Sequence, residues 1–329
     1  MRVVLYFIFS LALLNAGIFP IDITPINKDG AVKKSSKKEN VFMGVKILDQ
    51  RQFVFHSING EKFSEISDLA YLPKKKKLFM VSDEGRLFTF KAKFGNKIEL
   101  LEPEDGVELR KKNGKKFKGW RKDSEGLALD GKGRLIISFE GNAKIGWFHK
   151  NSAKYGRMIK KYKLPKELKN PNNYRSRNKS LEALAWHHKY GLLTASEWPL
   201  KKYSKKRQVI YALNGKKWYF KAEPESKSAI SAIEVMDDGN VLVLERSFNG
   251  FLNPFIVTLK KVYLNRCKNG LCKTEILLKM NSHKGWGVDN FEGLARVGTN
   301  RYLIISDDND NFFQKTLLIY FEVQDKFES

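Results

Sequence analysis

Residues 124–140 read SEGLALDGKGRLIISFE, and this stretch decides the fold. A short apolar run, Leu127–Leu129, leads into a glycine-rich turn, and a second apolar run, Leu135–Phe139, ends at Glu140. Two strand-like runs joined by such a turn are typical of a β-hairpin. The pattern occurs five times along the chain, and its opening blocks are Ser67–Tyr71, Glu125–Leu129, Glu182–Trp186, Ser231–Val235 and Glu292–Arg296.

The spacing of these repeats predicts a β-propeller. Their central apolar residues recur at intervals of roughly 50 to 60 residues, a period typical of repeat architectures. Each interval holds about four β-rich segments without a helical period, and in the second unit these are 125–129, 134–139, 144–149 and 157–162. The residues after Leu294 and the residues from Val41 to Leu69 together have the length of one further interval, so the two ends of the chain can complete one blade. We therefore expect an all-β chain that forms a single propeller of five, or alternatively six, four-stranded blades, closed by an N-terminal strand such as 45–48 or 53–58.

The N-terminus has the features of a secretory signal peptide. Arg2 precedes the apolar run Val3–Leu14, and the small residues Ala16 and Gly17 follow it. The alternative is an uncleaved anchor. We predict a signal peptide at 1–17, a flexible linker at 18–40 and the propeller at 41–329, with no integral membrane domain and a periplasmic or secreted location.

Export gives a role to the only two cysteines. Cys267 and Cys272 flank Asn269-Gly270, a dipeptide that favours a tight hairpin turn. In an oxidising compartment the two thiols should form a disulfide across that hairpin.

The chain is strongly basic, with 61 Lys and Arg against 36 Asp and Glu and a formal net charge of +25. An exported protein is not expected to bind nucleic acid, despite this charge. We expect the charge to attract an anionic small-molecule substrate or an anionic envelope surface, unless it has no specific partner. We expect a monomer.

Acidic residues should gather at one end of the blades, against this positive background. Since the second strand of a hairpin ends beside the start of the first, acids at both places should converge on one mouth of the central channel. The second runs end at Asp83, Glu140, Glu197, Glu245 and Asp307, and three blocks begin with Glu125, Glu182 and Glu292.

Crowded carboxylates need neutralisation, because like charges disfavour ionisation. Ca²⁺ takes about six to eight oxygen ligands, so these eight acids form a predicted Ca²⁺ site. Arg246 is an alternative internal counter-ion, and the acids have an alternative structural role as acceptors of backbone N–H groups. His283, in a loop before the last block, is a candidate acid or base, and with Arg246 and Glu292 it makes up the predicted catalytic set.

These blocks resemble the phytase-like family, described as esterase-like activity of phytase. The resemblance rests on SEISDLAY with VSDEGRLF, DSEGLALD with ISFEG, SLEALAW with TASEW, VLVLERSF, and NFEGLAR with ISDDND, and covers about residues 60–325. It implies an exported bacterial propeller and, loosely, an esterase or phosphatase. The first and fourth blocks here carry Ser67 and Ser231 where the others carry Glu, so the predicted ring of acids is asymmetric.

Two functions follow from these observations. The first is a Ca²⁺-dependent hydrolase of phosphate or carboxylic esters, with its site at the acidic mouth. The second is a non-catalytic binding or scaffold propeller of the cell envelope, in which the acids are structural and the Lys-rich loops bind the partner.

Overall fold

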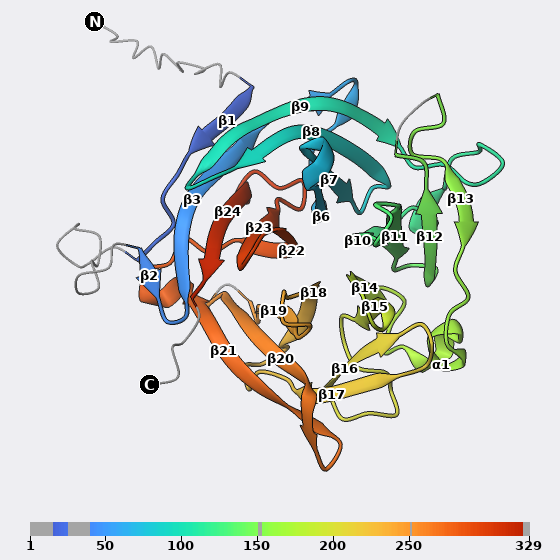
Figure 1. Cartoon of the computed structure of the whole chain (residues 1–329), viewed down its shortest axis with the longest axis vertical. Coiled ribbons are helices and arrows are strands. Elements are labelled where there is room, and N and C mark those ends of the chain that lie inside the picture. The colour runs from blue at the N-terminus through green and yellow to red at the C-terminus, as the bar shows by residue number, and fades with distance from the viewer. Residues whose placement is uncertain (1–15, 26–39, 151–152, 251, 325–329) are drawn as a thin grey trace, which may run out of the picture.

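The computed structural model describes residues 16–25, 40–150, 153–250 and 252–324. Within these residues the chain forms six antiparallel sheets, and the five larger ones are arranged in a ring about a common centre (Figure 1). Each of these five sheets contributes four strands to a blade, so the prediction of an all-β propeller with five blades is confirmed.

The blades follow one another along the chain. Blade 1 consists of β6 (Ile66–Leu72), β7 (Lys77–Ser82), β8 (Arg86–Phe94) and β9 (Ile98–Glu108), and blade 2 of β10 (Ser124–Leu129), β11 (Leu135–Phe139), β12 (Lys144–Phe148) and β13 (Met158–Lys161). Blade 3 consists of β14 (Leu181–His187), β15 (Gly191–Ser196), β16 (Arg207–Ala212) and β17 (Lys217–Lys221), and blade 4 of β18 (Ala229–Val235), β19 (Val241–Ser247), β20 (Ile256–Lys268) and β21 (Leu271–Asn281). Blade 5 consists of β22 (Asn290–Gly298), β23 (Arg301–Asp307), β24 (Thr316–Val323) and β3 (Val45–Val54).

The two ends of the chain close the ring. Strand β3 pairs antiparallel with β24, in a register that runs from Val45↔Val323 to Phe53↔Thr316. This confirms the prediction that an N-terminal strand completes the last blade. Closure removes a free sheet edge that would otherwise be exposed for pairing with another chain.

The segment before β3 is partly described. Strand β1 (Gly17–Pro20) pairs with β3, and Ile23 is buried against blades 4 and 5, so these residues of the predicted linker lie against the ring. Residues 1–15 of the predicted signal peptide and residues 26–39 of the linker lie outside the described residues. Strand β2 (Val41–Phe42) also pairs with β3, and β4 (Ser57–Ile58) pairs with β5 (Glu61–Lys62). In the described part of the chain, no helix is long and apolar enough to cross a membrane.

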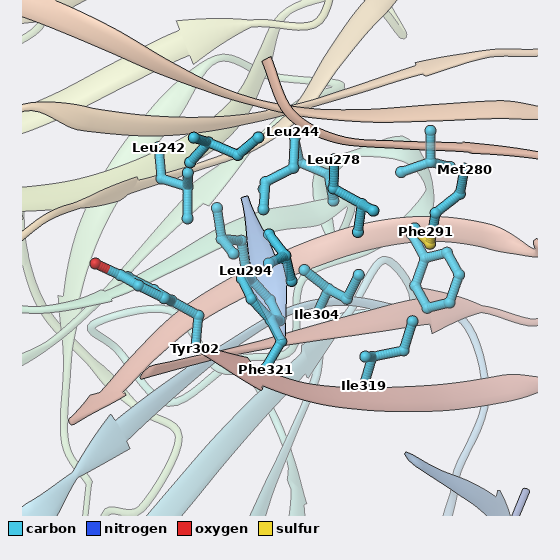
Figure 2. Close-up of a cluster of buried hydrophobic side chains, with 14 of the residues drawn as sticks. Leu242, Leu244, Leu278, Met280, Phe291, Leu294, Tyr302, Ile304, Ile319 and Phe321 are labelled. Atoms are coloured by element: carbon cyan, nitrogen blue, oxygen red, sulfur yellow. The ribbon is translucent and has the colours of Figure 1, made fainter. Parts of the chain in front are cut away.

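Apolar side chains from the two faces of each blade hold neighbouring blades together. The central residues of the five repeats, Leu69, Leu127, Leu184, Ile233 and Leu294, are at most 2% exposed. Figure 2 shows one such interface, where Leu242 and Leu244 of blade 4 lie against Leu294 and Ile304 of blade 5. Truncation of a buried Leu to Ala lowers the free energy of unfolding by about 2–5 kcal/mol. The contacts between blades therefore contribute substantially to the stability of the ring.

The predicted disulfide is present between Cys267 and Cys272. It joins β20 and β21 across the turn Asn269-Gly270, in which both residues have positive φ angles of 51° and 73°. Such angles are easy for Gly and tolerated by Asn, which explains why this dipeptide occupies the turn.

Candidate active site

Each innermost strand has a β-bulge at the same repeat position. In blade 3, for example, Leu181 pairs with Ser196 and Ala183 pairs with Ala195, which leaves Glu182 without a ladder partner. A bulge changes the direction of the unpaired side chain. The residues at the five bulges are Ser67, Glu125 with Gly126, Glu182, Ser231 and Glu292.

A second set of side chains lies beside the bulges, at the end of each second strand. The central residue of each repeat has a cross-strand partner, such as Ile137 for Leu127. The residue three positions after that partner occupies the equivalent place in every blade. These residues are Asp83, Glu140, Glu197, Arg246 and Asp307. We use "acidic ring" for the seven carboxylates at the two positions: Asp83, Glu125, Glu140, Glu182, Glu197, Glu292 and Asp307.

The register differs from the sequence-based expectation at Glu245. Glu245 pairs with Ile230 in the ladder, so Arg246, one residue later, takes the ring position in blade 4. Because successive side chains of a strand point to opposite faces, the shift by one residue turns Glu245 away from the ring. Its carboxylate instead accepts hydrogen bonds from Glu223 N and Ser228 Oγ, both 2.8 Å away, and pairs with Lys260 Nζ at 2.9 Å.

Three groups of three carboxylates among the described residues could hold a metal ion. Glu65, Asp83 and Glu84 form one of them. The other two share Glu140, and they are Asp123 with Glu125 and Glu140, and Glu140 with Glu182 and Glu197. Within each group, one oxygen from every residue lies within 4.8 Å of the others. The sequence analysis missed Asp123, although an extra acid two residues before Glu125 in DSEGLALD was a visible signal.

Burial is the main cause of the altered acidity in the ring. It raises the pKa of Glu140 to about 8, with further increases from Glu197 and Asp123. Burial and, after it, the charge of Glu292 raise the pKa of Asp307 to about 9. Burial and the charges of Glu182, Glu140 and Asp123 hold the pKa of Glu125 well above its ordinary value. The carboxylates are thus crowded into a place where their charges lack full compensation.

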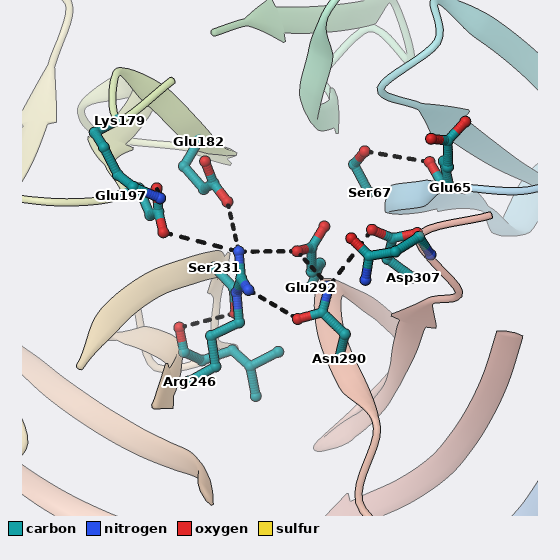
Figure 3. Close-up of polar contacts among 12 residues, drawn as sticks. Glu65, Ser67, Lys179, Glu182, Glu197, Ser231, Arg246, Asn290, Glu292 and Asp307 are labelled. Carbon is teal, nitrogen blue, oxygen red and sulfur yellow. Dashed lines mark hydrogen bonds and ion pairs between the residues drawn. The ribbon is translucent and has the colours of Figure 1, made fainter. Parts of the chain in front are cut away.

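Arg246 supplies compensation on one side of the ring (Figure 3). Its Nη2 lies 2.9 Å from Glu292 Oε1, 3.8 Å from Glu197 Oε1 and 4.0 Å from Glu182 Oε1. Its Nη1 donates a hydrogen bond to Asn290 Oδ1 at 2.8 Å. Burial opposes its charge, but the carboxylates of Glu292 and Glu197 raise the pKa of Arg246 above the usual value. The guanidinium is therefore in contact with the acids as an internal counter-ion, the alternative that the sequence left open.

Asn290 and Lys179 are further polar residues that the sequence analysis missed. Asn290 Nδ2 donates to Glu292 Oε1 at 2.9 Å and to Asp307 Oδ2 at 3.4 Å. Lys179 pairs with Glu197 at 2.5 Å. Asn290 lies two residues before the Glu of its block, as Asp123 does before Glu125, so this position is a signal for residues that contact the ring.

Some acids also tie blades together. Asp68 accepts backbone N–H groups from Leu127 in blade 2 at 2.7 Å and from Leu294 in blade 5 at 3.0 Å. Glu140 Oε1 accepts the N–H of Ser180, at the entry to blade 3, at 3.0 Å. A carboxylate at these places satisfies backbone donors that lack a partner in the ladder.

His283 lies in the connection between β21 and β22. It is exposed in the short 3-10 turn Ser282–Lys284 that follows β21, and its backbone N–H is bonded to Asn281 Oδ1. Among the described residues, its imidazole has no hydrogen bond or ion pair with a ring carboxylate.

A cavity of about 470 Å³ opens beside Glu140. Its lining includes Trp120 and the basic residues Lys169, Arg177 and Lys201. The guanidinium of Arg177 lies 4.7 Å from the Trp120 ring centroid. An anionic molecule could therefore reach the edge of the acidic ring through a positively charged entrance.

A family model described as phytase-like, esterase-like activity of phytase, matches residues 61–310. No curated protein matches the chain. Solved structures with a similar fold include the PQQ-bound aldose sugar dehydrogenase of Streptomyces coelicolor, at 13% identity and a TM-score of 0.45, covering 86% of this chain and 98% of that chain. They also include virginiamycin B lyase from Staphylococcus aureus, at 8% identity and a TM-score of 0.40, covering 93% of this chain and 99% of that chain. A catalytically inactive variant of that lyase with quinupristin has 11% identity and a TM-score of 0.40, covering 89% of this chain and 86% of that chain. At these values the structural likenesses carry no argument about activity.

Proposed function

The chain belongs to the phytase-like family, described as esterase-like activity of phytase, and from this premise we propose that it is an exported hydrolase of phosphate or carboxylic esters. Its reaction would take place at the acidic ring with the help of a divalent cation such as Ca²⁺. The observation that carries the proposal is the pair of carboxylate triads that share Glu140.

The donor set of the ring fits a hard cation. All the candidate ligands are carboxylates, and Glu140, Glu182 and Glu197 are 5–6% exposed, so few waters compete for them. The buried Oδ1 of Asp83 has no hydrogen-bond partner among the described residues. The raised pKa values of these acids indicate that negative charge is costly here, and a cation would remove that cost. Glu125, Glu140, Glu182 and Glu197 would hold the ion.

A bound divalent cation would polarise the ester oxygen and lower the pKa of an attacking water. The chain would contribute the rest of the chemistry. Arg246 would attract the anionic oxygens of the substrate, and Asn290 and Glu292 hold its guanidinium in a fixed orientation. Glu292 would take the proton of the water, since burial raises the pKa of its carboxyl above the ordinary value and makes it a stronger base, while Arg246 opposes that rise. No step is assigned to His283, whose described contacts lie away from the ring.

A specific observation favours a second function, a non-catalytic binding or scaffold propeller. Asp68, Glu140 and Glu245 accept N–H groups that belong to other blades or to the loops between blades. In that case the acids hold the ring together, and the basic loops would bind an anionic envelope surface. The two functions differ in their dependence on a cation.

Thermal unfolding in EDTA and in excess Ca²⁺ separates them. A cation that binds only the folded state at a hundred times its Kd adds about 2.7 kcal/mol of stability, so we expect the Tm to rise by several degrees. Glu140→Gln should abolish this rise, because it removes a ligand from both triads while leaving an acceptor for Ser180 N. Glu99→Gln is the matched control, since Glu99 is a surface acid paired with Lys93 far from the ring.

Hydrolysis of para-nitrophenyl phosphate and para-nitrophenyl acetate completes the test. A rise in Tm together with turnover that EDTA and Glu140→Gln both remove would support the hydrolase. Absence of both the Tm shift and turnover would overturn it in favour of the scaffold.

A further inference from the structure

A second cavity, of about 510 Å³, lies on the outer part of blade 2. It is bounded by the segment 111–121, which precedes β10, and by β12 and β13. Its charged lining residues are all cationic: Lys111, Lys112, Arg121, Lys144, Lys160 and Lys161. We call it the lysine cavity, and no described Asp or Glu lines it.

The absence of acids is unusual for this molecule. Within the described part of the chain, none of the six cations forms an ion pair with a carboxylate. Another buried lysine shows the contrast, since Lys260 Nζ lies 2.6 Å from Glu223 and 2.9 Å from Glu245. Buried charges in proteins are normally paired in this way, and Lys144, the buried cation of the cavity, has no such ion pair among the described residues.

Lys144 is the buried member of the group, and its side-chain amine is directed into an aromatic setting. The residue is 5% exposed, and its Nζ lies 3.7 Å from the ring centroid of Phe139 and 4.9 Å from that of Phe117. The Nζ donates one hydrogen bond, to Arg121 O at 2.8 Å. An ammonium has three donors, and the other two make no hydrogen bond to a described residue.

Most of the charged groups that act on Lys144 are positive. Burial first, and then Lys161, Lys111 and Arg121, lower the pKa of Lys144 to about 7. Asp123 is the acid that acts in the opposite direction. Lys111, Arg121 and Asp123 lie in the segment before β10, and Lys161 lies in β13. An anion in the cavity would relieve the repulsion among the cations.

We propose that the lysine cavity is a binding site for a multivalent oxyanion, a phosphate or sulfate group, separate from the acidic ring. Six cations can neutralise a doubly charged group with several donors at once, and Lys144 lies at the floor of the site. Such a group could belong to a small soluble molecule or to an anionic lipid headgroup at the envelope surface. The two sources share the same recognition chemistry, and the cavity accepts that chemistry independently of any hydrolysis at the ring.

Isothermal titration calorimetry with sodium sulfate tests the site, because the charge of sulfate is constant between pH 6 and pH 8. Ionic strength is held fixed with NaCl so that general attraction to a basic protein is screened equally. We expect one sulfate per chain at pH 6 and binding at least about tenfold weaker at pH 8, where Lys144 is mostly neutral. Lys144→Met should fold, since it replaces a buried unpaired charge by an apolar side chain, and should weaken binding at pH 6 at least tenfold.

Two further variants test whether the loss of sulfate binding is specific to the lysine cavity. The exposed pair Lys160→Gln/Lys161→Gln should weaken binding without a change in thermal stability. Lys163→Met, an exposed lysine outside the cavity, is the matched control and should bind as the wild type does. Equal losses in Lys144→Met and Lys163→Met, or no sulfate binding at all, would overturn the proposal.

Pyrophosphate and phosphatidylglycerol vesicles then distinguish the two sources of the anion. Binding of pyrophosphate alone would identify a soluble ligand, and vesicle binding that Lys144→Met removes would identify a headgroup. Either result supports the oxyanion site. Vesicle binding that survives Lys144→Met, without binding of either soluble anion, would contradict it.

Discussion

The two sides of the acidic ring are built from the same repeat positions and differ in charge balance. On the blade 2 side, Asp123, Glu125 and Glu140 lie together, and the charges acting most strongly on Glu125 are all negative. On the blade 5 side, Glu292 contacts Arg246 at 2.9 Å. A single change in blade 4, from an acid to an arginine at the strand-end position, separates the two environments.

The difference shows how a symmetric scaffold acquires a directional site. Five equivalent bulges and five equivalent strand ends supply ten positions, and the backbone treats them alike. The side chains then make one side suited to a cation and give the other its own positive charge.

The largest effect is expected from Arg246→Met. Removal of one partner from a buried ion pair costs about 3–5 kcal/mol, because it leaves buried charges without compensation. The side chain of Arg246 is 23% exposed and that of Glu292 10%, so the loss should lie near the lower end of this range. We expect a loss of this size in the free energy of unfolding, measured by urea titration at pH 7 in EDTA. Arg296→Met is the control: Arg296 pairs with Asp237 at the surface, where such pairs contribute up to about 1 kcal/mol. If both variants lost equally little stability, Arg246 would not be the counter-ion that the comparison requires.

The second prediction concerns pH. The pKa of Glu140 rises from 4.5 to about 8 and that of Asp83 from 3.8 to about 8 on folding. The folded chain therefore binds protons that the unfolded chain has released. The stabilising effect is complete below the unfolded values and is lost as the pH rises through about 8. In EDTA the free energy of unfolding should fall between pH 5 and pH 8, and Ca²⁺ should reduce the fall.

Glu140→Gln and Glu292→Gln should have opposite effects at pH 8. The first removes a carboxylate from the uncompensated side and should raise the free energy of unfolding by about 1 kcal/mol, besides flattening its pH dependence. The second removes the nearest partner of Arg246 and should lower the free energy of unfolding. Changes of the same sign would show that the two sides have the same charge balance.

The smallest effect is expected from adding charge at the two serine bulges. Ser67 and Ser231 are each 4% exposed and hold equivalent positions, but Ser231 shares its blade with Arg246 and Ser67 shares its blade with Asp83. Ser67→Glu should therefore destabilise the fold more than Ser231→Glu, by on the order of 1 kcal/mol, the size of a partly screened charge interaction. Thermal unfolding of the two variants in the same buffer measures the difference. Greater destabilisation by Ser231→Glu than by Ser67→Glu would contradict the difference in charge balance between the two sides.

Much of the fold could be predicted because the repeat is local. The strands of the second unit, the number of blades and the closing strand all follow from spacings along the chain. Glu245 was placed wrongly because its residue type, an acid at the end of the second run, outweighed the spacing. The central residue and its cross-strand partner are ten residues apart in blades 2 to 5, and only the hairpin of blade 1 is one residue longer. The ring position therefore lies 13 residues after Ile233, at Arg246.

The lysine cavity is a second feature that could not be predicted from the sequence. The basic run Arg110–Lys122 is visible in the sequence and is consistent with an exposed loop. In the structure this segment folds back against β12 and β13. Contacts between residues far apart in the sequence hold it there, such as the hydrogen bond from Arg157 Nε to Lys112 O at 2.8 Å. No local sequence pattern predicts such contacts. Lys144 lies in a strand that the repeat does predict, but its lack of an acidic partner is a property of the assembled blade.

The pairing of β3 with β24 has a consequence for the life of the chain. Blades 1 to 4 can each form from contiguous sequence, whereas blade 5 needs Val45 to meet Val323. Blade 5 therefore cannot form until the chain has been synthesised at least as far as β24. Until then the four earlier blades form an open arc whose end edges are unpaired, and such edges can pair wrongly or be held by a chaperone.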